Sequence, residues 1–438
     1  MTPTPHAPLS VPPRALGLGH AFLVTVGAMV GSGIFFTPAE IARRAGSLGG
    51  ALAVWVAGGV LSFLGALSVA ELGAAYPRTG GLYVWLDEAF GPRVAFLFGW
   101  TMLAVLAPSS VAFFAGLSAQ HLGVVTGLSP RPLAAGLVVV LALLNARGVS
   151  EAAWVQSATT VARVVGIAAL AVLALAGPGA APAAVAAPAG PGHGVSFGAL
   201  LGAIVPVLWA YDGWIGVTSL AGEVRSPGRT LPRALLGGTL AVMALYALMV
   251  LGLHRALGDA GLGASQAPGE ALGRHVAGEA GARAVSLLVA VSTLGACLIG
   301  MLAGTRVVAA LGMRVPRWGA LGRLSSRGTP NVALAVTAAG ALAYLHAASL
   351  GRLAEVFVVG AWPFYALGAV ATMVLRRKHP TLARPFLTPG YPWVNVVFLL
   401  ATVGMLAAFA VDSPPAAAAS LGIIALGLPV YAWVMRRG

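Results

Sequence analysis

The decapeptide GAMVGSGIFF, residues 27–36, places Gly31, Ser32 and Gly33 in the middle of a long apolar run, and Pro38 follows shortly after. Small residues at the centre of such a run predict that a membrane helix is interrupted there. In lipid an unpaired backbone N–H or C=O group is costly, so irregular backbone persists only where protein or water lines it. The break therefore indicates a binding site inside a helical bundle.

A second interruption of the same kind occurs near the middle of the chain. Residues 209–214 read WAYDGW, and Pro206 lies just before them in another apolar run. Each interrupted run is the first in a series of five, which is typical of a transporter built from two inverted repeats with its site at the membrane midplane. The two breaks therefore predict one shared site.

The composition is that of a membrane protein. Of 438 residues, 58% are hydrophobic and 9% are charged, whereas a soluble domain carries about 25% charged residues. Cutting the chain at charges, prolines and loop-like stretches leaves runs of the roughly 20 residues that a membrane helix needs. We therefore predict an all-α integral membrane protein with twelve transmembrane helices. The expected spans are residues 17–42, 49–75, 93–121, 131–146, 155–176, 197–221, 233–254, 283–310, 332–348, 353–375, 391–411 and 415–435.

The positive charge is distributed as a topology signal. A net charge of +14 could suggest a nucleic-acid partner, but the arginines stand singly or in short clusters between the apolar runs. We therefore predict a lipid bilayer and no nucleic acid around the chain. With the N-terminus inside, most positive residues fall on the inner face, which favours an even number of spans and two cytoplasmic termini in the cell (inner) membrane.

One long connection divides the chain into halves. The stretch from Gly177 to Gly194 is rich in Ala, Pro and Gly, with His193 as its one possible charge. This composition predicts a flexible external linker between the fifth and sixth spans. Everything else in residues 1–438 is expected to form a single integral domain.

The first break suggests its own ligand. N–H groups that begin a helix attract a carboxylate, and carbonyls that end one, here near Met29 and Val30, suit an ammonium group. A molecule with both groups on one carbon would satisfy both ends, which indicates an α-amino acid. Close helix packing is the alternative explanation for a small-residue motif.

Three carboxylates near the expected spans need separate explanations. Asp212 in the second break is a candidate functional group because a charge at the midplane is costly, and capping of the unwound turn is its alternative role. It is also the best available proton carrier if transport is coupled to protons. Glu71 and Glu223 lie beside Arg78 and Arg225, and we predict structural ion pairs there.

Other functional classes lack the residues they need. The histidines have no metal-ligand spacing, so we predict neither a metal nor a cofactor. An integral membrane enzyme would need a nucleophile with its base or a metal cluster, and a channel would need charged rings or repeated filter loops. The sequence has no such pattern, and the chain is predicted not to be an enzyme.

At these motifs the chain resembles the amino acid-polyamine-organocation superfamily, and within it the bacterial relatives of the L-type amino acid transporters. The resemblance covers nearly the whole chain and rests on the order of its motifs. These are GAMVGSGIFF at residues 27–36, ELGAAYPRTGG at 71–81, WAYDGW at 209–214, GEVRSPGRTLPRAL at 222–235 and RPFLTPGYPW at 384–393.

The resemblance implies a LeuT-type fold of five plus five helices with broken first and sixth helices and alternating access. A cytoplasmic tail (1–16) would precede a first repeat (17–176), a second repeat (197–375) and two trailing helices (391–435). It assigns the substrate carboxylate to the backbone of Ser32, Gly33 and Ile34, and the ammonium group to carbonyls near Met29, Trp209 and Asp212. Trp209 takes the position of an aromatic gate, with ordinary packing as the alternative. The candidate substrate-binding residues are Met29, Val30, Gly31, Ser32, Gly33, Ile34, Trp209, Tyr211, Asp212, Gly213 and Trp214.

Arg163 is the charge most relevant to mechanism. Gln156, Thr159, Thr160 and Arg163 are similar to a pattern in sodium-independent relatives, which place a lysine in the fifth helix where sodium-coupled members of the fold bind a cation. The guanidinium would replace that cation and bind carbonyls of the first span, and Ser292, which aligns loosely, would join it. Reaching back to the cytoplasmic interface is the alternative for this side chain.

The chain departs from the family pattern in two places. Ile215 stands where many L-type relatives have asparagine, which leaves side-chain selectivity open, and the loop after Arg306 is short and altered. We predict a sodium-independent secondary transporter of amino acids, with neutral amino acids as the favoured substrates. Another small amine or an organic cation is the alternative substrate.

Overall fold

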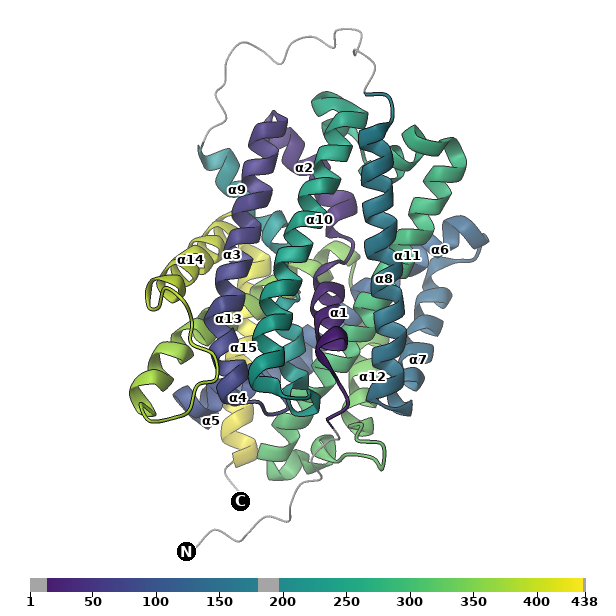
Figure 1. Ribbon diagram of the computed structural model, residues 1–438. Coiled ribbons are helices and arrows are strands. Elements are labelled where there is room, and N and C mark those ends of the chain that lie inside the picture. The colour runs from purple at the N-terminus through teal and green to yellow at the C-terminus, as the bar shows by residue number, and fades with distance from the viewer. Residues whose placement is uncertain (1–13, 180–196, 436–438) are drawn as a thin grey trace, which may run out of the picture.

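The computed structural model describes residues 14–179 and 197–435. Regular structure in these ranges is helical, apart from an isolated bridge between Leu16 and Val224 (Figure 1). Residues 1–13 of the expected tail (1–16), most of the linker with His193, and the last three residues lie outside the described ranges.

The helices follow one another with short connections. In chain order they are α1 (Leu18–Met29), α2 (Gly33–Ala45), α3 (Leu48–Ala75), α4 (Leu82–Phe90), α5 (Pro92–Thr101), the π-helix η1 (Met102–Leu106), α6 (Ala107–Thr126), α7 (Pro130–Arg147), α8 (Val149–Ala176), α9 (Phe197–Ala210), the 3-10 helix η2 (Trp214–Glu223), α10 (Pro227–Ala264), α11 (Pro268–Arg314), the 3-10 helix η3 (Pro316–Gly322), α12 (Asn331–Ala347), α13 (Leu350–Lys378), α14 (Trp393–Asp412) and α15 (Pro414–Met435).

Among the described residues, nine helical segments are long and apolar enough to cross a membrane, and α1 with α2 can form a tenth span bent by 44°. Two expected spans fall short of that test. The helix α12 is apolar but has 17 residues, and α9 with η2 is interrupted. Every expected span nevertheless coincides with helix.

Several helices extend beyond the predicted bounds. The fifth expected span begins at Val149 rather than residue 155, and α11 begins at Pro268 rather than 283 but is kinked at Ala277 and Gly278. The helix α10 continues to Ala264 past a kink at Gly258, whose φ is 68°. These extensions carry polar residues that a hydropathy cut removes, and in α10 and α11 they are short helical pieces joined to the apolar helix through a kink.

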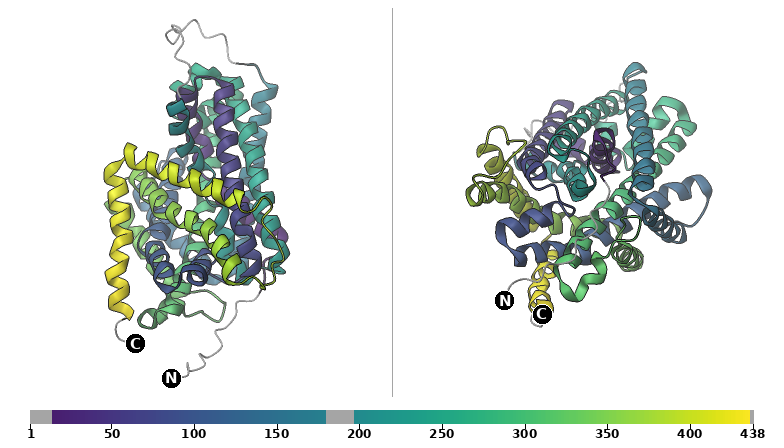
Figure 2. Two further views of the ribbon diagram at one scale, coloured as in Figure 1. Left: turned by 90° about the vertical axis from the view of Figure 1, so that its left-hand side faces the viewer. Right: turned by 60° about the horizontal axis from the view of Figure 1, so that its bottom comes forward.

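The broken pair α1 and α2 lies in the interior of the bundle (Figure 1). The helices α8, α10, α11 and η2 all pack against α1, and α9 and α10 pack against α2. By contrast, α14 and α15 lie at the edge (Figure 2), where large apolar side chains such as Val411 (83% exposed) face outward. Such faces suit a lipid surround rather than water.

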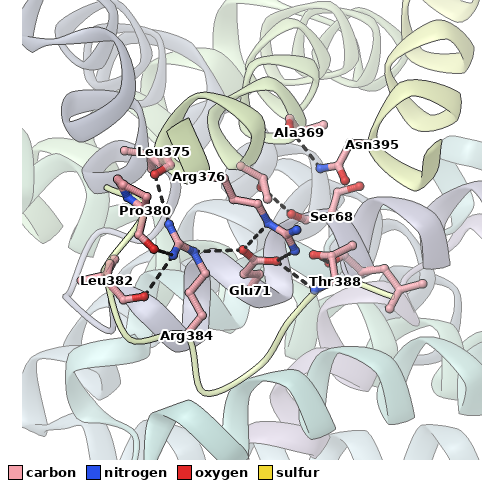
Figure 3. A network of polar contacts seen from close by, with 12 residues as sticks. Ser68, Glu71, Ala369, Leu375, Arg376, Pro380, Leu382, Arg384, Thr388 and Asn395 are labelled. Carbon is pink, nitrogen blue, oxygen red and sulfur yellow. Dashed lines mark hydrogen bonds and ion pairs between the residues drawn. The ribbon is translucent and has the colours of Figure 1, made fainter. Parts of the chain in front are cut away.

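Glu71 on α3 fastens the connection between α13 and α14 (Figure 3). Its carboxylate accepts hydrogen bonds from Arg376 Nε at 2.8 Å and Nη2 at 2.6 Å, and from the Thr388 N–H at 2.8 Å. Arg384 Nε lies 3.3 Å from the same carboxylate. The pairing of a buried carboxylate with two guanidinium groups fixes this connection to the end of α3.

The ion pairs predicted at Glu71 and Glu223 exist, but the partners differ from those expected. Arg78, expected beside Glu71, pairs instead with Glu88, and Arg225 donates from Nε to the Arg14 carbonyl at 3.0 Å. Neighbours in sequence were the wrong guide because α3 and η2 direct their carboxylates toward other helices.

Glu223 ends η2 at a three-way junction. Its Oε1 accepts from Arg306 Nε of α11 at 3.0 Å, and both side chains are buried. Its backbone carbonyl accepts from the Leu16 N–H at 2.9 Å. Glu223 thus joins the end of η2 to α11 and to the segment that leads into α1.

Candidate functional site

The two breaks cross in direct contact. A β-carbon on Gly33 would lie 2.7 Å from Ala210 Cβ and 2.8 Å from its Cα. Gly213 has a φ of 105°, and a β-carbon there would lie 2.4 Å from the Ala28 carbonyl oxygen. Both distances are too short for any side chain, so glycine is required on each helix at the crossing.

The first break leaves backbone donors unused. The Phe35 N–H bonds the Ser32 carbonyl at 3.0 Å, whereas the N–H groups of Ser32, Gly33 and Ile34 have no hydrogen-bond partner among the described residues. They stand at the start of α2, where the helix dipole adds positive potential. This arrangement can bind an anionic group.

The carbonyls of the same break already have protein partners. Val30 accepts from Arg163 Nη1 at 2.9 Å and from Ser292 Oγ at 3.1 Å, which uses both of its lone pairs. Met29 accepts from Tyr246 Oη at 2.9 Å and from the Gly31 N–H at 2.9 Å, so both of its lone pairs are also in use. Neither carbonyl therefore offers a free lone pair to an ammonium group.

Arg163 lies wholly inside the bundle with 0% of its surface exposed. Besides Val30 it donates to the Ser292 carbonyl at 2.8 Å and to Thr160 Oγ1 at 2.8 Å. Because α8 begins at Val149, Arg163 is fourteen residues, or about 21 Å, into the helix. A β-carbon on Gly27 would lie 2.3 Å from its Nη2, so the guanidinium rests directly on the backbone of α1.

Tyr246 on α10 was missed by the sequence analysis. Its hydroxyl lies 2.9 Å from the Met29 carbonyl and 3.1 Å from the Ala210 carbonyl, so one side chain bridges both breaks. Its ring packs edge-on against Trp55 at 5.4 Å between centroids. The available signal was a tyrosine in the middle of an apolar span, where the hydroxyl must find a partner.

A cavity of about 160 Å³ opens at the crossing. Asp212 is the one charged residue on its described lining. Asp212 is buried, with 8% of the residue exposed, and its Oδ1 has no hydrogen-bond partner in the described chain. The apolar part of the lining comes mainly from Met102, Leu106, Phe113, Phe114, Ala296, Ile299, Ala303 and Phe357.

The structure separates the candidate substrate-binding residues into two groups. Seven line the cavity: Met29, Gly31, Ser32, Gly33, Trp209, Asp212 and Gly213. Four others are buried away from it: Val30, Ile34, Tyr211 and Trp214. Ile215, the departure from the family pattern, does line the cavity.

The lining of the cavity differs between its two ends. Thr218 and Ser219 of η2 and Gly80 of the connection after α3 line it at one end. At the other end, the ring of Trp209 meets Phe113 edge-on, with centroids 5.4 Å apart. Hydroxyl side chains therefore lie at one end of the cavity and aromatic rings at the other.

The described residues contain no cluster of three or more His, Cys, Asp or Glu side chains that could hold a metal. The chemistry of the cavity rests on backbone N–H groups, one carboxylate and an apolar wall. These groups can bind and orient a small molecule with a negative and a positive end.

Comparison with known proteins gives matches along almost the entire chain. The family described as amino acid permease matches residues 16–434. The serine/threonine exchanger SteT of Bacillus subtilis is 30% identical over 433 residues, which cover 97% of each chain. The b(0,+)-type amino acid transporter 1 of Mus musculus is 31% identical over 409 residues, covering 92% of this chain and 83% of the relative. The human cystine/glutamate transporter is 26% identical over 430 residues, covering 95% and 84%.

Proposed function

The chain belongs to the amino acid permease family of membrane transporters, and from this membership we propose that it moves neutral amino acids by alternating access without sodium. As a member of that family it is a multi-pass amino acid transporter and not an enzyme. The substrate class, the ion requirement and the mechanism are what the proposal adds.

The observation that carries the proposal is the pair of opposite binding groups at one cavity. Free N–H groups of Ser32 and Gly33, two residues that line the cavity, lie at the first break, next to the free N–H of Ile34. The unpartnered Oδ1 of Asp212 lies at the second break. The breaks touch at Gly33 and Ala210. A carboxylate and an ammonium group on the same carbon could therefore be bound at once.

A neutral side chain fits the rest of the lining. The ammonium group balances the charge of Asp212, and a cationic side chain would need a second acid, which the described lining lacks. A substrate amine without a carboxylate would leave three N–H groups unpaired in a site shielded from water, at a cost of roughly 1–3 kcal/mol for each group. This cost favours an amino acid over the alternative of a simple amine.

Independence from sodium rests on Arg163. Its guanidinium occupies the oxygen ligands offered by Val30 and Ser292, and an arginine stays charged in proteins. A cation close to it would be repelled. We propose that Arg163 and Ser292 form a permanent substitute for a bound cation.

The architecture proposed for the chain has twelve spans in two inverted repeats of five and two trailing helices. It is supported by the paired breaks, α1 with α2 and α9 with η2. The first repeat would comprise residues 17–176 and the second 197–375, with α14 and α15 at the edge. Arginines on the face of the termini support a cytoplasmic location for both ends, in the cell membrane.

Alternating access is supported by the contact between Trp209 and Phe113, which both line the cavity. With the termini cytoplasmic, these rings would cover the site on its outer side. Transport would require α1, α2, α9 and η2 to move against the remaining helices. In this proposal, Trp209 is part of the outer gate.

A ligand screen on the purified protein tests the proposal. A bound ligand raises the apparent melting temperature by mass action, so neutral amino acids should stabilise the protein in sodium and in choline buffer alike. Their methyl esters and the corresponding amines should not. Equal stabilisation by the esters would refute the carboxylate site, and stabilisation only in sodium would refute the role of Arg163.

Radiolabelled uptake into proteoliposomes completes the test. Liposomes preloaded with the stabilising amino acid should take up label faster than empty ones if the protein exchanges substrates. No uptake of any stabilising amino acid would show that the cavity binds without transporting.

A further inference from the structure

The third span contains an irregular turn beside the cavity. The π-helix η1 separates α5 from α6, and Pro108 follows it directly. Proline has no N–H group, so the carbonyl four residues earlier, that of Ala104, loses its α-helical donor. Single π-turns inside α-helices occur often at functional sites.

The helix α12 fits this irregularity at two points. The Tyr344 hydroxyl donates to the Ala104 carbonyl at 3.0 Å. One turn earlier, a β-carbon on Gly340 would lie 3.0 Å from Pro108 Cβ, so glycine lets α12 approach the proline without displacing it. The bond from Tyr344 thus satisfies a carbonyl that the proline leaves without its helical partner.

The same turn forms one wall of the cavity. Met102 and Leu106 of η1 and Ala107 at the start of α6 line it. Among the described residues, this stretch offers the cavity no charged group. Because the charged ends of an amino acid belong at the two breaks, an apolar wall beside them is left to contact the substrate side chain.

We infer that Tyr344 is a positioning residue for side-chain selectivity, acting through its hydrogen bond to Ala104 on the wall formed by Met102 and Leu106. This inference rests on the proposed transport of neutral amino acids. Tyr344 does not line the cavity, so any effect on selectivity must pass through the π-turn. Tyr344 would help the site distinguish amino acids with large apolar side chains from those with small ones.

The test is a double-mutant cycle of Tyr344→Phe and Pro108→Ala. Tyr344→Phe removes only the hydroxyl, and Pro108→Ala restores an N–H group that can bond Ala104. Dissociation constants for alanine, leucine and phenylalanine are measured with wild type, both single variants and the double variant. Tyr431→Phe on α15 is the matched control, because its hydroxyl has no hydrogen bond in the described structure and lies away from the cavity.

We expect Tyr344→Phe to change the ratio of the phenylalanine and alanine dissociation constants by about five-fold, as couplings between neighbouring groups permit. The alanine constant itself should change by less than about two-fold. In the Pro108→Ala background the same substitution should leave the ratio nearly unchanged, since Ala104 then has its own helical partner.

Two results would overturn the inference. One is an unchanged ratio of the phenylalanine and alanine dissociation constants in Tyr344→Phe. A uniform loss of affinity for all three amino acids also leaves this ratio unchanged, and it would show that the hydrogen bond only stabilises the fold. The other is an equal effect of Tyr344→Phe with and without Pro108. If instead wild type binds none of the neutral amino acids, the proposed function fails, and the inference fails with it.

Discussion

Replacing Arg163 by alanine should slow transport while leaving substrate affinity almost intact. The side chain does not line the cavity, but it joins α8 to the first break through Val30 and to α11 through the Ser292 carbonyl. Its removal therefore disconnects the broken helix from two helices that would stay fixed. The effect should fall on the movement between states rather than on binding.

The magnitude follows from the bonds that are lost. A hydrogen bond from a charged donor contributes roughly 1.5–3 kcal/mol, so the two contacts to Val30 and Ser292 amount to about 3–6 kcal/mol. Against this, Arg163 is a buried cation with no acidic partner among the described residues, and its removal relieves several kcal/mol of desolvation. We expect a net loss of about 1–3 kcal/mol. A barrier raised by about 1.4 kcal/mol slows transport about ten-fold.

The assay is radiolabelled uptake into proteoliposomes in sodium and in choline buffer, with dissociation constants from thermal shifts. We expect wild type to be equal in both buffers, and Arg163→Ala to be about ten-fold slower with affinity changed by less than about three-fold. Sodium should partly restore the variant, because Ser292, Thr160 and the Val30 carbonyl then present free oxygens to a cation.

The control is Arg147→Ala, which removes an exposed arginine at the end of α7 and should leave transport unchanged. A sodium requirement in wild type would show that Arg163 does not replace a cation. Normal turnover in Arg163→Ala would show that its contacts with Val30 and Ser292 play no part in transport.

Four further substitutions and one control, Glu88→Gln, test the remaining contacts. Tyr246→Phe should lower stability by roughly 1–3 kcal/mol in thermal melts, because it removes the donor that bridges both breaks; an unchanged melting temperature would contradict this. Glu71→Gln should destabilise by roughly 3 kcal/mol, since two guanidinium groups lose their counter-charge, whereas Glu88→Gln at an exposed pair should cost under about 1 kcal/mol. Asp212→Asn should weaken binding of every amino acid and abolish any uphill uptake driven by an imposed pH gradient; uptake as in wild type would exclude Asp212 as proton carrier. Gly33→Val should abolish ligand-induced thermal stabilisation because its β-carbon would collide with the second break, and retained stabilisation would refute the crossing.

The breaks were the part of the fold that local sequence could predict. Residues 31–33 and 211–213 interrupt apolar runs, and each interruption can be recognised from the residues of that one run. The approach of Arg163 to the first break was implied by the resemblance to the family rather than by local sequence, because Arg163 and Val30 lie in different helices. The breaks themselves depend on chemistry within one segment.

Contacts between distant segments were not predictable in the same way. Glu71 pairs with residues about three hundred positions away, and no local pattern distinguishes Arg376 from the nearer Arg78. Tyr246 and Tyr344 look alike in sequence, each a tyrosine in an apolar helix. Only packing reveals that one hydroxyl reaches both breaks and that the other reaches the carbonyl before a proline.

The site is asymmetric in a way that bears on transport. At the first break the carbonyls of Met29 and Val30 are held by Tyr246, Ser292 and Arg163, whereas the N–H groups beyond them have no partner in the described chain. The end of α1 is therefore bonded to helices of the surrounding bundle, whereas the N–H groups at the start of α2 need a ligand to complete their hydrogen bonds. In the proposed mechanism, a bound carboxylate would stabilise the start of α2 by bonds that the protein itself does not provide, and the binding energy would favour the state in which α2 closes over the substrate.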